Sequence, residues 1–321
     1  MPTTRKPRSG SMQYWPRKRA KRPFARVRSF STASEPGLLG FAGYKVGMTH
    51  VVMTDNRAHS LSKGKNIVCP VTIIECPSIK TASIIFYKKT TNGLQVSSAV
   101  VASNLDKELE RKISIPKAAK KKIEDFKAEE YDDIRALVYT QPKLTTIGKK
   151  KPELFEMSLG GKIEDKIAWA KENLGKEINV SDVLKEGSHL DIHAVTKGKG
   201  LGGPMKRFGI GRRSHKSEKS IRNPGNVGPW TGATQWRVAK AGQTGYHQRL
   251  EHNKWLIKVS TKPEEINTKP GFKRYGVVKN PFVLIKGSVA GATKRMIILT
   301  NPIRPNRKIP KEAPAINYIS K

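Results

Sequence analysis

Cysteine and long apolar runs are scarce in this chain, and each scarcity excludes a class of protein. Only Cys69 and Cys76 occur among 321 residues, and their spacing fits neither a zinc knuckle nor a redox pair. We therefore expect two buried free thiols in a reducing compartment. No apolar run reaches the roughly 18 residues that a membrane-spanning helix needs, so no such helix is predicted.

Acidic residues are also scarce, with 26 Asp and Glu against 62 Lys and Arg and a formal net charge of +36. Self-repulsion of this size opposes a compact free protein, so the composition predicts a polyanionic partner. The cations do not lie opposite an apolar helix face, which disfavours a membrane surface. We expect nucleic acid as the partner, with no membrane and no small-molecule substrate.

The segment from Thr196 to Lys258 has the composition expected of an RNA-binding extension. It holds fourteen Lys and Arg, eleven Gly, and only two acids, Glu218 and Glu251. It lacks the periodic apolar positions of a core segment but includes three tryptophans. Cations meet phosphates, flat rings stack on bases, and glycines allow close approach of the backbone.

The first 30 residues are similarly basic, with ten Lys and Arg and no acid. Aromatic residues Tyr14, Trp15 and Phe24 are interleaved with the charges, which favours an extension threading through RNA over a solvated tail or localisation signal. Across both segments we predict RNA contacts by Trp15, Arg17, Lys18, Arg19, Lys21, Arg22, Lys197, Lys199, Lys206, Arg207, Arg212, Arg213, His215, Lys216, Arg222, Trp230, Trp236, Arg237, Tyr246, His247 and Arg249.

Elsewhere the pattern predicts a mostly β protein with an α/β insertion. Short β-branched and aromatic runs between turn residues are typical of a small closed barrel. Residues 104–135 are neutral, with nine acids and nine bases, so we expect the insertion to face away from a polyanion.

The predicted helices span 106–112, 118–130 and 163–174, and a late strand spans 275–278. The expected divisions are an N-terminal extension at 1–36, a barrel body at 37–103 and 179–300, an insertion at 104–178, a long basic loop at 197–258, and a tail at 301–321.

Two patterns in the basic loop resemble enzyme sites but fit them poorly. Residues 198–203 read G-x-G-x-x-G, yet Pro204 follows, and we expect neither the helix nor the βαβ unit of a dinucleotide site. His215, His247 and His252 lack a cluster of acids, so we interpret them as RNA-contacting groups rather than metal ligands or catalysts. No nucleophile–base arrangement occurs. No catalytic residue, metal or cofactor is predicted.

Trp230 lies in the Pro/Gly turn Gly228-Pro-Trp-Thr-Gly232. Two interpretations stay open: an indole folded back on its own loop, or a stacking group at the end of a probe.

Four separated motifs resemble the universal large-subunit ribosomal protein L-three family in its archaeal and eukaryotic form, most closely the archaeal type. They are Gly40-Phe-Ala-Gly-Tyr-Lys-Val-Gly-Met-Thr-His, Ala194-Val-Thr-Lys-Gly-Lys-Gly, Ala241-Gly-Gln-Thr-Gly-Tyr-His-Gln-Arg and Leu284-Ile-Lys-Gly-Ser-Val-Ala-Gly-Ala-Thr-Lys-Arg. The resemblance implies a translation-type closed β-barrel body with long extensions that penetrate large-subunit rRNA. It also implies neighbouring ribosomal proteins, a cytoplasmic ribosomal location and a part in early subunit assembly.

In the family, the long loop approaches the peptidyl-transferase region with a tryptophan near its tip. Carried over, that tip is residues 228–230. Relatives often continue with a polar residue or His and then Pro, whereas Thr231 and Gly232 follow here, so the family's contacts are not carried over to residues 231–235.

Two other classes of function remain as alternatives to an rRNA-binding structural protein. An RNA-modifying or RNA-cleaving enzyme is disfavoured by the missing acidic cluster. A free DNA-compacting protein is disfavoured by the aromatics and the expected folded body, since compaction needs charge and little else.

Overall fold

The computed structural model describes residue 11 and residues 14–116, 121–216, 220–228, 238–306 and 310–321. Its contacts divide the chain into two compact units. Unit 1 comprises Met1–Pro23 and Val195–Gln248, and unit 2 comprises Phe24–Ala194 and Arg249–Lys321. In the described residues, no helix is both long and apolar enough to traverse a lipid bilayer.

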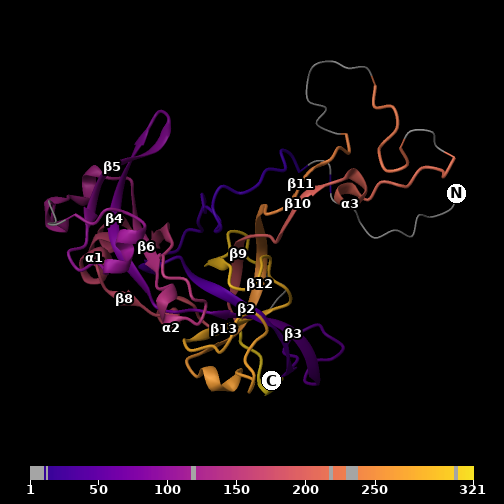
Figure 1. Ribbon diagram of the computed structural model, residues 1–321. Coiled ribbons are helices and arrows are strands. Elements are labelled where there is room, and N and C mark those ends of the chain that lie inside the picture. Colours follow the sequence, from indigo (N-terminus) through magenta and orange to yellow (C-terminus); the bar gives the residue numbers. More distant parts are fainter. Residues whose placement is uncertain (1–10, 12–13, 117–120, 217–219, 229–237, 307–309) are drawn as a thin grey trace. The chain divides into compact units, whose positions relative to one another are not determined.

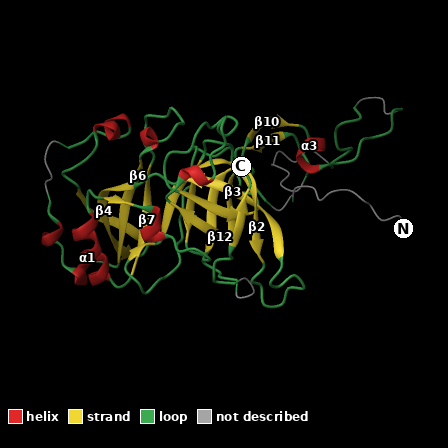
Figure 2. Ribbon diagram, turned by 90° about the horizontal axis from the view of Figure 1, so that it is seen from below, coloured by secondary structure: helices red, strands yellow, loops and turns green. Residues whose placement is uncertain are grey.

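Strands predominate and helices are short (Figure 2), which confirms the mostly β class. The α-helices are α1 (Ile163–Asn173), α2 (Val180–Val183) and α3 (Pro204–Phe208). The 3-10 helices are η1 (Lys107–Arg111), η2 (Ile123–Asp125), η3 (Ala128–Glu130), η4 (Pro142–Leu144) and η5 (Pro263–Glu265).

One antiparallel sheet of unit 2 has the order β1-β7-β6-β4-β5, with β8 paired to β4. Its strands are β1 (Gly37–Leu38), β4 (Ile79–Thr90), β5 (Gly93–Val101), β6 (Asp133–Thr140), β7 (Leu154–Gly160) and β8 (Glu177–Ile178). Strands β4, β5, β6 and β8 of this sheet are labelled in Figure 1. Helix α1 buries Ile167 and Ala170 at the apolar spacing that predicted it. β4 precedes residue 103 yet pairs with β6 and β8, which follow it, so hydrogen bonding continues across that expected boundary.

The other large sheet has the order β14-β9-β12-β13-β3-β2-β15, and β14 also pairs with β2. Its strands are β2 (Gly40–Thr54), β3 (Asn66–Glu75), β9 (His189–Val195), β12 (Gln248–Ser260), β13 (Phe282–Lys286), β14 (Met296–Thr300) and β15 (Ile316–Ile319). β2 lies antiparallel to both β14 and β3, with Tyr44 opposite Met296 on one side and Glu75 on the other.

The core of unit 2 explains the glycine at position 43 and the two thiols. Phe41, Ile73 and Leu284 are fully buried. A Cβ at Gly43 would lie 2.6 Å from Ile74 Cγ2 and 2.7 Å from Cys76 Sγ, closer than packed atoms approach. Cys69 and Cys76 are free and buried, as expected, and burial raises the pKa of the Cys76 thiol.

The predicted helix over 118–130 is wrong. Residues 117–120 lie outside the described residues, and the rest forms the separate turns η2 and η3 with extended backbone at Phe126. The Phe126 ring stacks on Phe86 with centroids 4.4 Å apart. This tertiary contact outweighs the modest local preference for helix. Over 106–112 a helical turn does form, but as the 3-10 helix η1.

The predicted strand over 275–278 is also wrong. Phe272 and Gly276 close a tight turn by exchanging backbone hydrogen bonds of 2.9 and 3.0 Å. Gly276 has a φ of 103°, which an extended strand does not permit. Val277 and Val278 therefore follow a tight turn and do not form a strand.

Candidate nucleic-acid interface

The described residues of unit 1 include no Asp or Glu, so their cations have no carboxylate partner within that part of the unit. Its many exposed cations are Lys18, Arg19, Lys21, Arg22, Lys197, Lys199, Lys206, Arg212, Arg213, Lys216, Arg222 and Lys240. A surface with one sign of charge attracts polyanions and repels itself. Its geometry therefore depends on contacts other than ion pairs.

The N-terminal arm, defined as residues 14–23, hydrogen-bonds to the chain that follows β11 (Gly242–Gly245). The Ala20 N–H donates to the Tyr246 carbonyl at 2.8 Å. The His247 ring donates through Nδ1 to the Lys18 carbonyl at 2.8 Å. His247 is 9% exposed, and its own N–H donates to Thr196 Oγ1 at 3.1 Å. His247 thus fixes the arm to the long loop in this structure.

Arg207 and Arg17 join the arm to α3 through aromatic rings. The Arg207 guanidinium lies 5.7 Å from the Trp15 ring centroid and 5.1 Å from that of Phe208. Arg17 lies over the same Phe208 ring at 4.2 Å and donates to the Arg207 carbonyl at 3.4 Å. Cations over aromatic faces are attracted to the ring quadrupole. Two of the predicted RNA-contacting arginines therefore also build the scaffold.

The Arg207 side chain is 7% exposed and is held by backbone carbonyls. Its Nε donates to Gln243 at 3.2 Å, and one terminal nitrogen donates to Lys240 at 3.0 Å. Burial lowers the pKa of Arg207. Its hydrogen-bond acceptors are neutral carbonyls rather than a carboxylate, so they do not offset the positive charge of the guanidinium.

β10 (Gly198–Gly202) and β11 form a two-stranded antiparallel ribbon beside α3 (Figure 1). Gly245 has a φ of 70°, and a Cβ there would overlap the Lys197 carbonyl oxygen. The ribbon thus requires glycine where its two strands approach most closely. The glycines of the 198–203 motif shape this ribbon.

The expectation that no helix begins after this motif is wrong, because α3 starts at Pro204 and ends at Phe208. Proline suits the first helical turn, where its missing N–H costs nothing. Gly209, with a φ of 65°, terminates the helix. A dinucleotide site needs a parallel βαβ unit, whereas β10 pairs antiparallel with β11. The antiparallel pairing of β10 with β11 therefore disfavours a dinucleotide site at this motif.

Most of the remaining predicted contact residues fall in three places of unit 1. Lys197 and Lys199 lie at the ribbon, Lys206 on α3, and Arg212, Arg213, His215, Lys216 and Arg222 on the exposed chain after α3. Arg249 lies on β12 and belongs to unit 2. Trp230, Trp236 and Arg237 lie outside the described residues. The burial of Arg207 and His247 was not foreseen, because their carbonyl partners are distant in sequence or carry no residue-specific signal.

His252 belongs to a structural network in unit 2. Its Nδ1 donates to the buried carboxylate of Asp191 at 2.8 Å, and the same carboxylate accepts the Asn253 N–H at 2.9 Å and the Ile303 N–H at 3.2 Å. Among the described residues, no group of three or more His, Cys, Asp or Glu could hold a metal ion. Asp191 therefore links β9 to β12 and to the chain after β14 by accepting hydrogen bonds.

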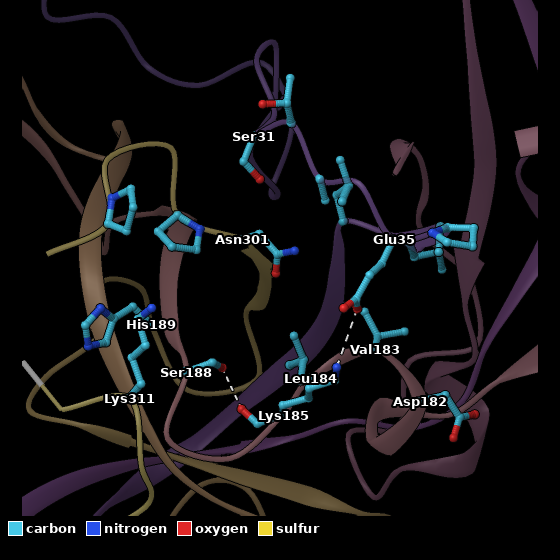
Figure 3. Close-up of a pocket in the computed structure, with 18 of the residues that line it drawn as sticks. Ser31, Glu35, Asp182, Val183, Leu184, Lys185, Ser188, His189, Asn301 and Lys311 are labelled. Atoms are coloured by element: carbon cyan, nitrogen blue, oxygen red, sulfur yellow. Dashed lines mark hydrogen bonds and ion pairs between the residues drawn. The ribbon is translucent and has the colours of Figure 1, made fainter. Parts of the chain in front are cut away.

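Unit 2 also contains a cavity of about 590 Å³ lined by residues from 31–39, 182–189 and 301–311 (Figure 3). Its wall carries an exposed Glu35–Lys185 ion pair of 3.5 Å, and Ser188 donates to the Lys185 carbonyl at 2.6 Å. Burial lowers the pKa of His189. The lining residues form no nucleophile–base pair among themselves, so the cavity offers no arrangement for catalysis.

A family model for Ribosomal protein L3 matches residues 1–321. The large ribosomal subunit protein uL3 of Methanobrevibacter smithii is 46% identical over 325 residues, which cover 98% of this chain and 96% of that protein. The uL3 proteins of Methanosphaera stadtmanae and Methanocaldococcus jannaschii are 47% and 44% identical, each with the same coverage of 98% and 96%. This agreement extends over both units, and the chain therefore belongs to the ribosomal protein L3 family.

Proposed function

We propose that unit 1 binds large-subunit rRNA, with the N-terminal arm, the β10–β11 ribbon and α3 acting as one preformed scaffold. Family membership makes the chain a structural, non-enzymatic constituent of the large ribosomal subunit. The proposal depends on one observation: some cations of unit 1 are used for internal contacts, and the others stay exposed. Arg207 and Arg17 face inward onto rings and carbonyls, while cations such as Lys199 and Arg212 stay exposed where no described residue of the unit is acidic.

This arrangement suits a phosphate backbone for two reasons. Fixed cations lose less conformational freedom on binding than cations on a mobile tail. Exposed lysines and arginines release condensed counterions when they neutralise phosphates, which supplies much of the binding free energy. Trp15 and Tyr246 add ring surface beside the charges, and rings stack on unpaired bases.

The family resemblance extends the proposal to the rest of the molecule. We propose that the body of unit 2 is a translation-type closed barrel, since the strand path β14-β9-β12-β13-β3-β2 returns to β14. The long loop would extend toward the peptidyl-transferase region with Trp230 near its tip. The protein would support early subunit assembly beside neighbouring ribosomal proteins, on cytoplasmic ribosomes.

The test is the salt dependence of binding to a transcript of large-subunit rRNA. If on the order of ten phosphates are neutralised, the slope of log affinity against log salt should lie between about −7 and −9. The triple variant Lys197→Gln, Lys199→Gln, Lys206→Gln should reduce the size of that slope by about 2 to 3. A wild-type slope near about −2, or a triple variant with an unchanged slope, would reject unit 1 as the interface.

A further inference from the structure

A second stretch of the chain shares the charge signature of unit 1 but belongs to the folded body. Residues 266–311 hold eleven Lys and Arg and no acid, and they lie in unit 2. None of the predicted contact residues falls in this stretch. A basic run without acids favours a polyanionic partner, since self-repulsion otherwise opposes folding.

Two tight turns present three of the exposed cations of this stretch. In the first, residues 272–276, the backbone of Phe272 and Gly276 closes the turn and leaves Lys273 and Arg274 exposed at its tip. Arg274 has a φ of 66°. A left-handed backbone at a non-glycine residue is uncommon and persists where the surroundings enforce it.

The surroundings that enforce this turn are a buried carboxylate and its donors. Glu75 is fully buried and accepts the Tyr275 hydroxyl, together with the N–H groups of Lys279 and Asn280 at 2.9 Å each. Thr146 also donates to the Val277 carbonyl at 2.9 Å. Tyr275 follows Arg274 directly, so the hydrogen bond from Tyr275 to the buried Glu75 also fixes the backbone at the cationic tip.

The second turn precedes β14 and has the same character. Lys294 is exposed and has a φ of 70°, and its N–H donates to the Lys45 carbonyl at 2.8 Å. The Lys45 ammonium donates to the carbonyls of Val289 and Gly291 and so holds the turn to β2. Lys294 is therefore presented from an anchored backbone, as Arg274 is.

Both turns attach to β2 within three residues of each other. Lys45 pairs with the backbone of Lys294 and Arg295, and the position of a Cβ on Gly47 lies 3.6 Å from Phe272 Cδ1. Within the described part of the chain, Lys273, Arg274 and Lys294 form no ion pair. By contrast, Lys80, Lys143 and Lys166 around the insertion all pair with carboxylates.

We infer that Lys273, Arg274 and Lys294, together called the body cluster, form a second phosphate-binding face for structured rRNA. The inference rests on the proposed rRNA-binding function and assigns it a separate site in unit 2. RNA backbone is the partner that fits, because three cations that are fixed by rigid turns and form no ion pair with the described residues match phosphates and not an apolar surface. The body cluster would position unit 2 on RNA independently of the long loop.

The experiment compares two triple variants of the full chain with equal loss of charge. Lys273→Gln, Arg274→Gln, Lys294→Gln removes the body cluster, and Lys107→Gln, Lys127→Gln, Lys171→Gln removes three exposed lysines of the insertion. The first should weaken rRNA binding at least about tenfold and reduce the size of the salt slope by about 2 to 3, while the second should change the slope by less than about 1. Equal effects of the two triples would overturn the inference.

A charge-preserving variant separates electrostatics from folding. Lys273→Arg, Arg274→Lys, Lys294→Arg should keep affinity within about threefold of wild type, because phosphates attract either cation. A loss as large as that of the glutamine triple would show a structural effect and overturn the inference. The unit 1 triple described above keeps the two proposals distinct. If that triple weakens binding and the body-cluster triple does not, only the second face fails.

Discussion

Arg207 shows how a single cation can serve structure in a surface built for phosphate. Its guanidinium lies near the rings of Trp15 and Phe208 and donates to two carbonyls. We expect Arg207→Ala to lower the local stability of unit 1 by about 2–4 kcal/mol, from lost hydrogen bonds and ring contacts. Hydrogen exchange of the amides over 242–248 would measure this as faster local opening.

Arg207→Lys is the matched control because it keeps the positive charge but replaces the planar guanidinium, with its several fixed donors, by an ammonium group. A lysine cannot donate to both carbonyls while lying flat on a ring, so we expect exchange nearly as fast as in the alanine variant. Wild-type protection in Arg207→Lys would show that charge alone holds this position and would contradict a scaffolding role.

Two buried histidines should make unit 2 less stable in mild acid. Burial lowers the pKa of both His189 and His193 below the ordinary value near 6.5. The unfolded chain therefore binds protons first as pH falls below about 6.5, and the free energy of unfolding falls by at most about 1.4 kcal/mol per pH unit for each histidine. The loss ends once pH is below the lowered folded-state pKa values.

Denaturant unfolding between pH 7.5 and 5 would measure this slope, since ordinary carboxylates titrate mainly below that range. The double variant His189→Gln, His193→Gln should flatten the pH dependence. His59→Gln, which replaces an exposed histidine, should leave it unchanged. The prediction fails if the double variant and wild type show the same slope.

Among the elements, the β10–β11 ribbon depends most on a single glycine. Gly245→Ala would place a methyl group on the Lys197 carbonyl oxygen at a φ of 70°. Strain of this kind costs on the order of 1–3 kcal/mol before the overlap is counted. We expect the ribbon to open and rRNA affinity to fall at least about tenfold, equivalent to about 1.4 kcal/mol.

Gly225→Ala is the matched control for the ribbon. A Cβ at Gly225 meets no atom within 4 Å, so the substitution adds the same methyl group to the same unit without overlap. Its affinity for rRNA should equal that of wild type. Equal losses in both variants would mean that any stiffening of the unit weakens binding, and that the ribbon has no special role.

The sequence predicted elements where local signals agree with burial. α1 follows the helical spacing of Ile163, Ile167 and Ala170, and β13 follows the apolar run from Phe282. It failed where a distant partner decides the backbone. Phe86 determines the path of Phe126, and Glu75 determines that of Tyr275, and neither partner is visible in the local pattern.

The same limit applies to the candidate site. Composition identified which segments carry the cations, because charge and glycine content need no geometry. Which cations face inward depends on carbonyl acceptors such as those of Gln243 and Lys240, and every residue has a carbonyl. The sequence also contains the acid-free run at 266–311. Apolar strands interrupt this run, so its composition does not resemble that of a basic RNA-binding extension.

At the scale of the whole molecule, cations are sorted by whether acids accompany them. In the insertion they are balanced: Arg135 and Lys166 share Asp133 at 3.0 and 2.7 Å. In unit 1 and in residues 266–311 that balance is missing. A protein carrying +36 thus concentrates its uncompensated charge on particular surfaces, and only those surfaces should respond to charge reversal.

A balanced surface and an uncompensated one should respond differently to the same charge reversal. Lys121 and Lys122 lie in the insertion beside Glu124 and Asp125, and Lys121 already donates to Ser98 Oγ at 2.8 Å. Lys121→Glu with Lys122→Glu should change rRNA affinity by less than about threefold, whereas Lys197→Glu with Lys199→Glu, an identical change in net charge, should cost well over tenfold, or more than about 1.4 kcal/mol. Filter binding at one fixed salt concentration measures both, because affinities at different salt cannot be compared. A tenfold loss from the insertion pair would show that this face also contacts RNA, and charge sorting would then not distinguish the surfaces that bind from those that do not.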